Sequence, residues 1–286
     1  MLAAAADAKK RSKRSHYSPP HAAIVIDAYS GKVLYADNAD KPRFPASITK
    51  VMTLYILFEQ LREGRLTLDT QMPVSAYAAS RPPSNLNLKA GGSITVRDAM
   101  YALVTKSAND VASVVAEAIG GSEDAFARMM TQKARSMGMT ATTFRNASGL
   151  PDAAQKTTAR DLVTLGRRML TDFPEQAKIF RTRFFQYGEA RYKNHNSLLF
   201  SYAGMEGMKT GFTNASGFNL LASCKRHDKH LIAVVLGGRS SGHRNARMRE
   251  LLNSAWKKAV AFNDLKQRRE DRPVAVAGIL QADLMP

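Results

Sequence analysis

The sequence feature that most constrains the fold is an apolar run near the N-terminus, Val51-Met52-Thr53-Leu54-Tyr55-Ile56-Leu57-Phe58. The run contains neither proline nor glycine, and it passes directly into a polar stretch that ends at Gly64. This pattern predicts a buried helix that begins near residue 47 and stops at the glycine. We take this helix as the element around which the rest of the chain is organised.

Two reactive side chains stand in the first turn of the predicted helix. Ser47 and Lys50 are three residues apart and therefore share one helix face, so the hydroxyl and the ammonium can touch. A serine beside a base is a candidate nucleophile. Lys50 can be that base only if its pKa falls from about 10.4, and both burial and the positive end of the helix dipole lower it. Ser-x-x-Lys alone is a weak pattern, because Ser254 and Lys257 form a second copy.

Length and composition indicate one globular domain with tails. The chain has 286 residues, 44% hydrophobic and 23% charged, and we expect a disordered basic arm over 1–17, the domain over 18–263 and a tail over 264–286. The longest apolar runs, 51–58 and 231–236, are far shorter than the roughly 20 residues of a membrane helix. The first eight residues end in the small-x-small pattern of a signal cleavage site, which favours an exported protein whose signal peptide is largely missing here.

The charge balance is strongly basic. There are 42 Lys and Arg against 24 Asp and Glu, a formal net charge of +18 with a pI near 10.1. We recognise no nucleic-acid-binding motif and no interleaving of basic and aromatic residues, so we expect no nucleic-acid partner. An anionic polymer, as neighbour or substrate, would be attracted to such a field. Part of the excess lies in the tails, at Lys9, Lys10, Arg11, Lys13, Arg14, Lys266, Arg268, Arg269 and Arg272.

Neither cysteine nor histidine suggests a metal or a cofactor. The single cysteine, Cys224, lies in a strand-like run and reads as a small buried apolar residue rather than a reactive thiol. The closest histidine pair, His227 and His230, falls in a short segment between two predicted strands, which favours a solvated turn over a metal site. We expect no metal and no cofactor.

The order of elements predicts an α/β (α+β) fold. A β-hairpin over 22–36 precedes the helix over 47–63, and loop with short strands follows over 70–94. The segment 184–187 begins a return to strands after a largely helical middle. The sequence therefore predicts an antiparallel sheet flanked by helices, with an all-α subdomain inserted over about 65–172 and a site in the groove between the two parts. The remaining predicted helices are 96–104, opened by a Thr95–Asp98 capping box, 111–119, capped by Asn109 or Asp110, 122–136, 158–170, opened by a second capping box, and 243–262; the remaining strands are 207–213, 217–224 and 230–236.

Two further short motifs lie on elements that can present them to a groove. Ser107-Ala108-Asn109 falls between two predicted helices, although Asn109 could equally be an ordinary helix cap. Lys209-Thr210-Gly211 lies in a predicted strand, where glycine is costly unless a ligand or another backbone approaches closely. Its lysine could instead protect an exposed edge strand from aggregation.

Taken together, the three motifs resemble those of the penicillin-recognising serine acyl-transferases. Ser107 follows Lys50 by 57 residues, and Lys209 follows Asn109 by 100 residues. Over about residues 20–262 the chain is similar to the low-molecular-weight D-alanyl-D-alanine carboxypeptidases, including the stretch 143–152. The Ala at position 108 and the absence of glutamate from that stretch distinguish it from a class A β-lactamase. The resemblance implies a β-lactamase/transpeptidase-like fold.

The resemblance also implies a reaction and a role for each residue. Ser47 would attack the penultimate carbonyl of a peptidoglycan stem peptide ending in D-Ala-D-Ala, with neutral Lys50 as base. Penicillin and other β-lactams would acylate the same serine. The remaining roles are proton relay for Ser107, stem-peptide binding for Asn109, positive potential for Lys209, carboxylate binding for Thr210 and Arg244, strand pairing with the substrate for Gly211, and oxyanion donation by the backbone N–H groups of Ser47 and Phe212.

Several alternatives stay open at this point. Arg244 could be one of several arginines on a solvated helix. An endopeptidase that cuts cross-links would use the same residues, and a non-catalytic cell-wall-binding or β-lactam-sensing module would keep the pocket. The family carries a further β-rich domain and often a membrane anchor, whereas 24 residues follow Phe262 here, so membrane association is open. The implied location is periplasmic or otherwise extracytoplasmic.

Overall fold

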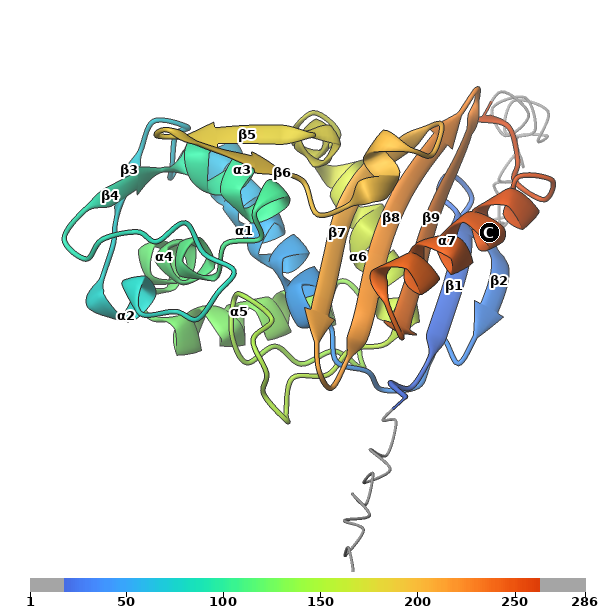
Figure 1. The fold of residues 1–286 in the computed structure, drawn as a ribbon, viewed down its shortest axis with the longest axis horizontal. Coiled ribbons are helices and arrows are strands. Elements are labelled where there is room, and N and C mark those ends of the chain that lie inside the picture. Colours follow the sequence, from blue (N-terminus) through green and yellow to red (C-terminus); the bar gives the residue numbers. More distant parts are fainter. Residues whose placement is uncertain (1–17, 263–286) are drawn as a thin grey trace, which may run out of the picture.

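A five-stranded antiparallel sheet brings together the two ends of the described chain. The computed structural model describes residues 18–262, so the predicted arm over 1–17 and tail over 264–286 lie outside the described residues. The strand order is β2-β1-β9-β8-β7, which places the N-terminal hairpin beside the C-terminal strands (Figure 1). The strands are β1 (Ala22–Asp27), β2 (Val33–Asp37), β7 (Met205–Thr213), β8 (Gly217–Arg226) and β9 (Lys229–Gly238).

The central strands are buried on both faces because each face is covered by helices. Successive strand residues point to opposite sides, so Ala23 and Val25 join one apolar cluster while Ile24 and Ile26 join the other. Helix α7 (Ser241–Ala255) covers the first face and α6 (Ala159–Asp172) the second. Cys224 is buried in the α7-side cluster, as the sequence predicted, and burial raises the pKa of its thiol to about 12.

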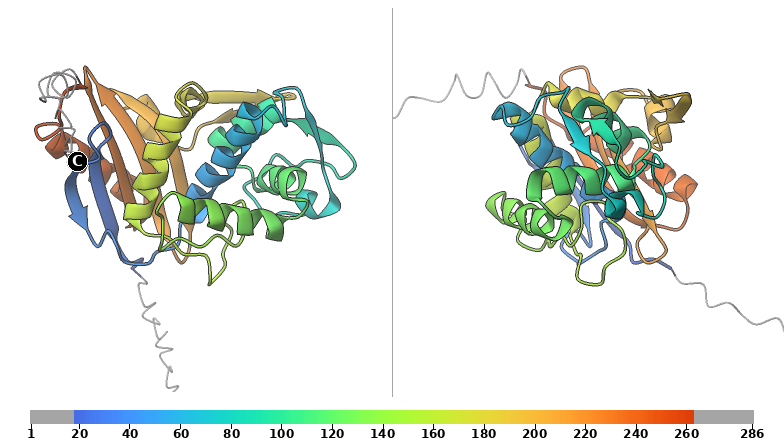
Figure 2. Two further views of the ribbon diagram at one scale, coloured as in Figure 1. Left: turned by 180° about the vertical axis from the view of Figure 1, so that it is seen from behind. Right: turned by 90° about the vertical axis from the view of Figure 1, so that its left-hand side faces the viewer.

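The apolar run forms the helix that links the sheet to the rest of the molecule. A 3-10 turn, η1 (Ala46–Thr49), leads into α1 (Lys50–Arg62), and every side chain from 51 to 58 is buried. Helix α1 contacts α6 on one side and α3, α4 and α5 on the other, which Figure 2 shows from behind the sheet. The prediction of a buried helix is confirmed, except that Ser47 lies in the 3-10 turn and not in the α-helix itself.

Beyond α1 the chain builds a largely helical part. Its helices are α2 (Ala76–Ala79), α3 (Val96–Thr105), α4 (Asn109–Gly120) and α5 (Glu123–Ser136). The side chains of Thr95, Ser122 and Thr158 accept the first free N–H groups of α3, α5 and α6, which confirms the predicted starts. A two-stranded ribbon, β3 (Gln71–Pro73) with β4 (Ser93–Thr95), also belongs to this part, so it is not built from helices alone.

Three details of the predicted elements are wrong. Neither Asn109 nor Asp110 is the N-cap of α4, because both already belong to its first turn and the N-cap position is Ala108. Helix α7 ends at Ala255 and does not reach Phe262. The strand β5 (Phe184–Tyr187) pairs with a strand that was not predicted, β6 (Ala190–Lys193), whose polar sequence lacks the apolar alternation of a buried strand. The 3-10 turns η2 (Gln176–Arg181) and η3 (Ser197–Phe200) flank this ribbon.

A glycine joins the long loop after α5 to the turn that carries Ser47. Gly149 has φ +86°, and a Cβ built on it would stand 1.9 Å from the carbonyl oxygen of Ala46. The loop backbone therefore passes against η1 with no room for a side chain. This contact holds the loop beside the serine.

We expect Gly149→Ala to destabilise the fold far more than Gly64→Ala. Both glycines have positive φ, but a Cβ at Gly64 meets nothing within 4 Å, so that change carries only the left-handed backbone cost of about 1 kcal/mol. The steric overlap at Gly149 should bring the loss above about 3 kcal/mol. Urea unfolding of both variants measures the difference, and equal losses would show that the loop does not depend on this contact.

Candidate active site

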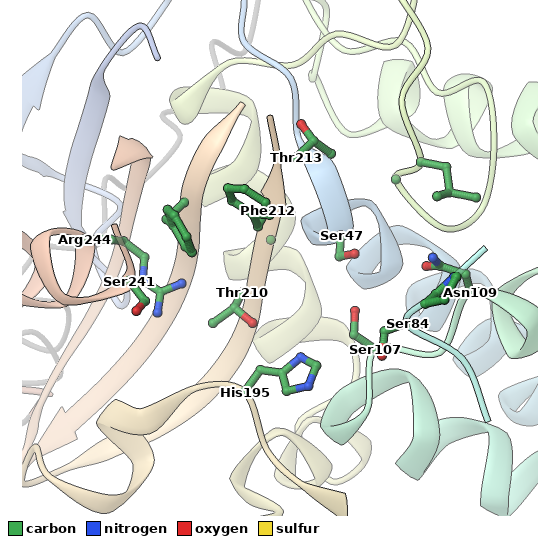
Figure 3. A pocket seen from close by; sticks show the side chains of 15 residues that line it. Ser47, Ser84, Ser107, Asn109, His195, Thr210, Phe212, Thr213, Ser241 and Arg244 are labelled. Carbon is green, nitrogen blue, oxygen red and sulfur yellow. The ribbon is translucent and has the colours of Figure 1, made fainter. Parts of the chain in front are cut away.

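A pocket of about 380 Å³ opens between β7 and the starts of η1, α4 and α7 (Figure 3). Seven of the nine residues singled out in the sequence line it, so elements distant in the chain converge there. Lys50 and Lys209 are buried next to the lining residues. The lining residues are Ser47, Pro83, Ser84, Ser107, Asn109, Gly149, Leu150, His195, Thr210, Gly211, Phe212, Thr213, Phe218, Ser241 and Arg244.

The Lys50 amine is completely buried and has three oxygen neighbours. Its Nζ lies 3.2 Å from Ser47 Oγ, 2.7 Å from Asn109 Oδ1 and 2.6 Å from the carbonyl oxygen of Ser148. A neutral amine has two N–H donors and one lone pair. Donation to Asn109 and Ser148 leaves the lone pair for the hydroxyl of Ser47, which is the arrangement of a base and its nucleophile.

Burial is the main reason that the pKa of Lys50 lies well below its usual value, and the positive charge of Lys209 is the second. The sequence predicted the effect of burial but not the contribution of Lys209. Two buried carboxylates, Glu123 and Asp110, oppose this effect and raise the pKa of Lys50. Asp110 accepts the N–H groups of Leu86 and Leu88, so it also fixes the segment that borders the pocket.

Ser107 has a left-handed backbone conformation, which residues other than glycine rarely adopt. Its φ is +60°, in the left-handed region that costs a non-glycine residue of order 1–3 kcal/mol. The neighbouring segment holds it there, since Ser84 donates to the carbonyl of Lys106 and accepts the N–H of Asn109. The Asn109 amide also donates to the carbonyl of Pro82 at 2.8 Å. The Ser107 hydroxyl consequently points into the pocket (Figure 3).

Two buried cations lie on the β7 side of the pocket. Lys209 is 1% exposed and donates to the carbonyl of Thr210 at 2.9 Å, so it does not guard an exposed strand edge. Burial, and after it the charge of Arg244, lowers the pKa of Lys209 to about 7. Arg244 donates to Asn219 O and Asn245 Oδ1, and burial lowers its pKa to about 10. Arg244 therefore does not lie on a solvated helix face.

Gly211 allows β7 to pass against the Ser47 turn. A Cβ on it would stand 2.9 Å from the backbone nitrogen of Ser47 and 3.0 Å from Ala46 Cβ. The close approach expected from the sequence is therefore made by the protein's own backbone. The next residue, Phe212, is 51% exposed at the pocket rim, and its ring lies 4.3 Å from that of Phe218.

His195 belongs to the pocket, but sequence reasoning missed it. It lies between Ser107 and Thr210 in Figure 3 and is open to solvent. Desolvation by the surrounding pocket residues lowers the pKa of His195, and the positive charges of Lys209, Lys106 and Lys50 lower it further, to about 4. A lone histidine in a polar loop carries no motif, so only the folded chain reveals it.

The histidine pair that the sequence did single out is not wholly a solvated turn. His230 is partly buried, with Nε2 2.7 Å from Ser223 Oγ and 3.1 Å from a Glu206 carboxylate oxygen. Within residues 18–262 no group of three or more histidine, cysteine or acidic side chains is placed to hold a metal ion.

The lowered pKa of Lys209 predicts a specific pH dependence of stability. Between pH 7 and about 10.4 the unfolded chain binds a proton on this lysine that the folded chain lacks. The free energy of unfolding of the wild type, relative to Lys209→Met, should therefore rise with pH across this window, by up to about 1.4 kcal/mol per unit. Urea unfolding at several pH values measures it; a difference that is flat or falls with pH would contradict the buried, weakly basic amine.

Comparison with known proteins agrees with this geometry. The family model described as D-alanyl-D-alanine carboxypeptidase, Peptidase_S11, matches residues 9–240. DacC of Escherichia coli K12 is 36% identical over 236 residues, which cover 80% of this chain and 59% of DacC. DacF of Bacillus subtilis 168 is 32% identical over 255 residues, which cover 87% of this chain and 65% of DacF. The chain thus spans about three fifths of the length of these curated relatives.

Solved structures show the same architecture and confirm the predicted fold class. The carboxypeptidase DacD from Francisella tularensis aligns with a TM-score of 0.79 at 31% identity, covering 84% of this chain and 70% of that one. Penicillin-binding protein D2 from Listeria monocytogenes, in its ampicillin-bound form, aligns with a TM-score of 0.72 at 29% identity, covering 82% and 96%. On the family match and these alignments, the chain belongs to the D-alanyl-D-alanine carboxypeptidases of peptidase family S11.

Proposed function

We propose that this chain is a serine-type D-Ala-D-Ala carboxypeptidase that removes the terminal D-alanine from peptidoglycan stem peptides. The observation that carries the proposal is the buried Lys50 amine, 3.2 Å from Ser47 Oγ at the floor of an open pocket. A binding module has no use for a lysine whose pKa burial lowers so far that its amine can be neutral and take a proton.

In the first step, Ser47 Oγ forms a bond to the carbonyl carbon of the penultimate D-alanine, and its proton passes to Lys50 Nζ. The resulting ammonium has three N–H groups, and the acceptors already in place are Ser47 Oγ, Asn109 Oδ1 and the Ser148 carbonyl. The negative oxygen of the intermediate would be bound by the backbone N–H groups of Ser47 and Phe212. Gly211 keeps these two segments in contact.

The C–N bond then breaks as Ser107 relays to the leaving nitrogen the proton that Lys50 took up, so free D-alanine departs and Lys50 is neutral again. The carboxylate of this residue would bind Thr210 and Arg244, with Lys209 adding positive potential beside Ser107. Asn109 would hold the stem-peptide amide. Water finally hydrolyses the ester on Ser47 and restores the hydroxyl. A β-lactam would acylate the same serine and give an ester that water hydrolyses slowly. The Listeria relative was solved in an ampicillin-bound form.

Because peptidoglycan lies outside the cytoplasm, we expect the chain to act in the periplasm or cell wall. Among residues 18–262 no helix combines the length and the apolar character needed to cross a membrane.

We expect Ser47→Ala and Lys50→Met each to reduce D-alanine release from a D-Ala-D-Ala peptide by more than about a thousandfold, because nucleophile and base act as one unit. The second Ser-x-x-Lys copy supplies the matched control: Ser254→Ala and Lys257→Met change exposed residues and should leave the rate unaltered. Release of D-alanine by an amino-acid oxidase assay measures all four variants.

Fluorescent penicillin followed by mass spectrometry gives an independent readout on the same variants. The adduct should map to Ser47 and be lost in Ser47→Ala. An adduct without D-alanine release would indicate a β-lactam-binding module, and release of cross-link products from dimeric muropeptides without D-alanine would indicate an endopeptidase. No adduct at all would contradict the hypothesis that Ser47 forms an acyl-enzyme.

A further inference from the structure

The β5–β6 ribbon has two different faces. Phe185 and Tyr192 are opposite each other in the register and point toward α3, where Phe185 stacks on Tyr101 at 5.7 Å. Phe184 and Lys193 form the neighbouring opposite pair and point away from α3. The ribbon lies over α3 along the upper edge of the molecule in Figure 1. Its outward side is therefore available to a ligand.

Cations and aromatic rings alternate on this outward side, which we call the ribbon face and define as Arg183, Phe184, Arg191, Lys193 and Phe200. Arg191 lies 4.1 Å above the ring of Phe184, which is itself 42% exposed. Lys193 and Arg183 lie 4.7 and 5.6 Å from the ring of Phe200. Basic and aromatic residues do interleave here, contrary to the expectation from the sequence.

The three cations of the ribbon face lack acidic partners. Within the described residues none of Arg183, Arg191 and Lys193 forms an ion pair, whereas the nearby Glu206 is already paired with Arg181 and His230. The ribbon's one acidic side chain, Glu189, lies in the turn between the strands. A guanidinium stacked on a ring keeps its N–H donors at its edge, ready for a carboxylate.

The ribbon face continues into the pocket. Strand β6 ends at Lys193, two residues before the pocket residue His195. From the other side, Lys106 precedes Ser107 and places its Nζ 5.0 Å from the ring of Tyr192. A ligand that extends out of the pocket along this side would therefore meet the ribbon face next.

We propose that the ribbon face binds an anionic glycan strand, namely the polymer whose stem peptide occupies the pocket. The inference rests on the proposed function. The exposed ring of Phe184 and the partly exposed ring of Phe200 offer apolar surface to the C–H faces of sugars. The unpaired arginine and lysine side chains match the carboxylates of the attached peptides. Binding of the strand beside the pocket raises the local concentration of neighbouring stem peptides, so it should favour polymeric over short substrates.

The test compares two triple variants of the full chain. The ribbon variant is Phe184→Thr, Arg191→Thr, Lys193→Thr, in which threonine keeps the preference for strands. The control variant, Val33→Thr, Lys225→Thr, Lys257→Thr, removes one exposed apolar side chain and two exposed cations outside the pocket lining, so both variants lose the same charge. Thermal unfolding verifies that each is folded, and Arg191→Glu serves as a second ribbon variant if the triple is not.

Cosedimentation with insoluble peptidoglycan at low and high salt measures binding. We expect the ribbon variant to bind on the order of tenfold more weakly than the wild type, and its kcat/KM for D-alanine release from the polymer to fall by a similar factor. A short D-Ala-D-Ala peptide and penicillin should react at unchanged rates, and the control variant should match the wild type throughout.

Equal binding by the ribbon and control variants would overturn the inference. So would a loss of binding confined to vesicles of phosphatidylglycerol, which would assign the ribbon face to an anionic membrane surface. A failure of the proposed function is distinguishable, because the wild type would then release no D-alanine from either substrate while cosedimentation still reports on the ribbon face.

Discussion

The burial of one lysine amine is the constraint on which the rest of the site depends. Removing a lysine amine from solvent costs free energy unless its N–H groups find hydrogen-bond acceptors. The neighbours of Lys50 Nζ come from three separate segments: the η1 turn, the start of α4 and the loop after α5. Because the amine is buried beside a second positive charge, its pKa falls well below the usual value. The same burial that costs stability makes the lysine usable as a base.

The fold supplies this burial through the position of α1. The helix is enclosed between the sheet layer and the helical part, so its N-terminal end emerges at the groove where β7 and α4 begin to line the pocket. Two glycines permit the final approach: Gly149 admits the loop that carries the Ser148 carbonyl, and Gly211 admits β7. Strain is concentrated at Ser107, whose left-handed backbone is held by the segment around Ser84.

Much of this arrangement could be predicted from the sequence. Helix starts at Thr95, Ser122 and Thr158 were readable because a capping side chain is a local signal, and the central helix because eight apolar residues in succession require a core. The three motifs predicted the pocket through their resemblance to those of the penicillin-recognising serine acyl-transferases. The structure places those residues together, while the role of each in the reaction stays a prediction.

What could not be predicted depends on tertiary contacts. The third partner of Lys50 is a backbone carbonyl, which any residue could supply, and His195 enters the pocket from a polar loop without a motif. The strand β6 and the ribbon face could not be predicted because β6 carries one aromatic residue among mostly polar ones and pairs only with β5, outside the core sheet. The end of α7 was missed because no glycine or proline marks it.

Direct titration of the Lys50 amine tests the central claim most sharply. In protein labelled with 13C at the lysine Cε, the Lys50 resonance can be assigned by its loss in Lys50→Arg and followed as a function of pH. A midpoint well below the ordinary lysine value of about 10.4 is the predicted result, and this midpoint should shift when the neighbouring charge is removed in Lys209→Met. A midpoint at the ordinary value would mean that Lys50 is charged throughout the working range and cannot be the base.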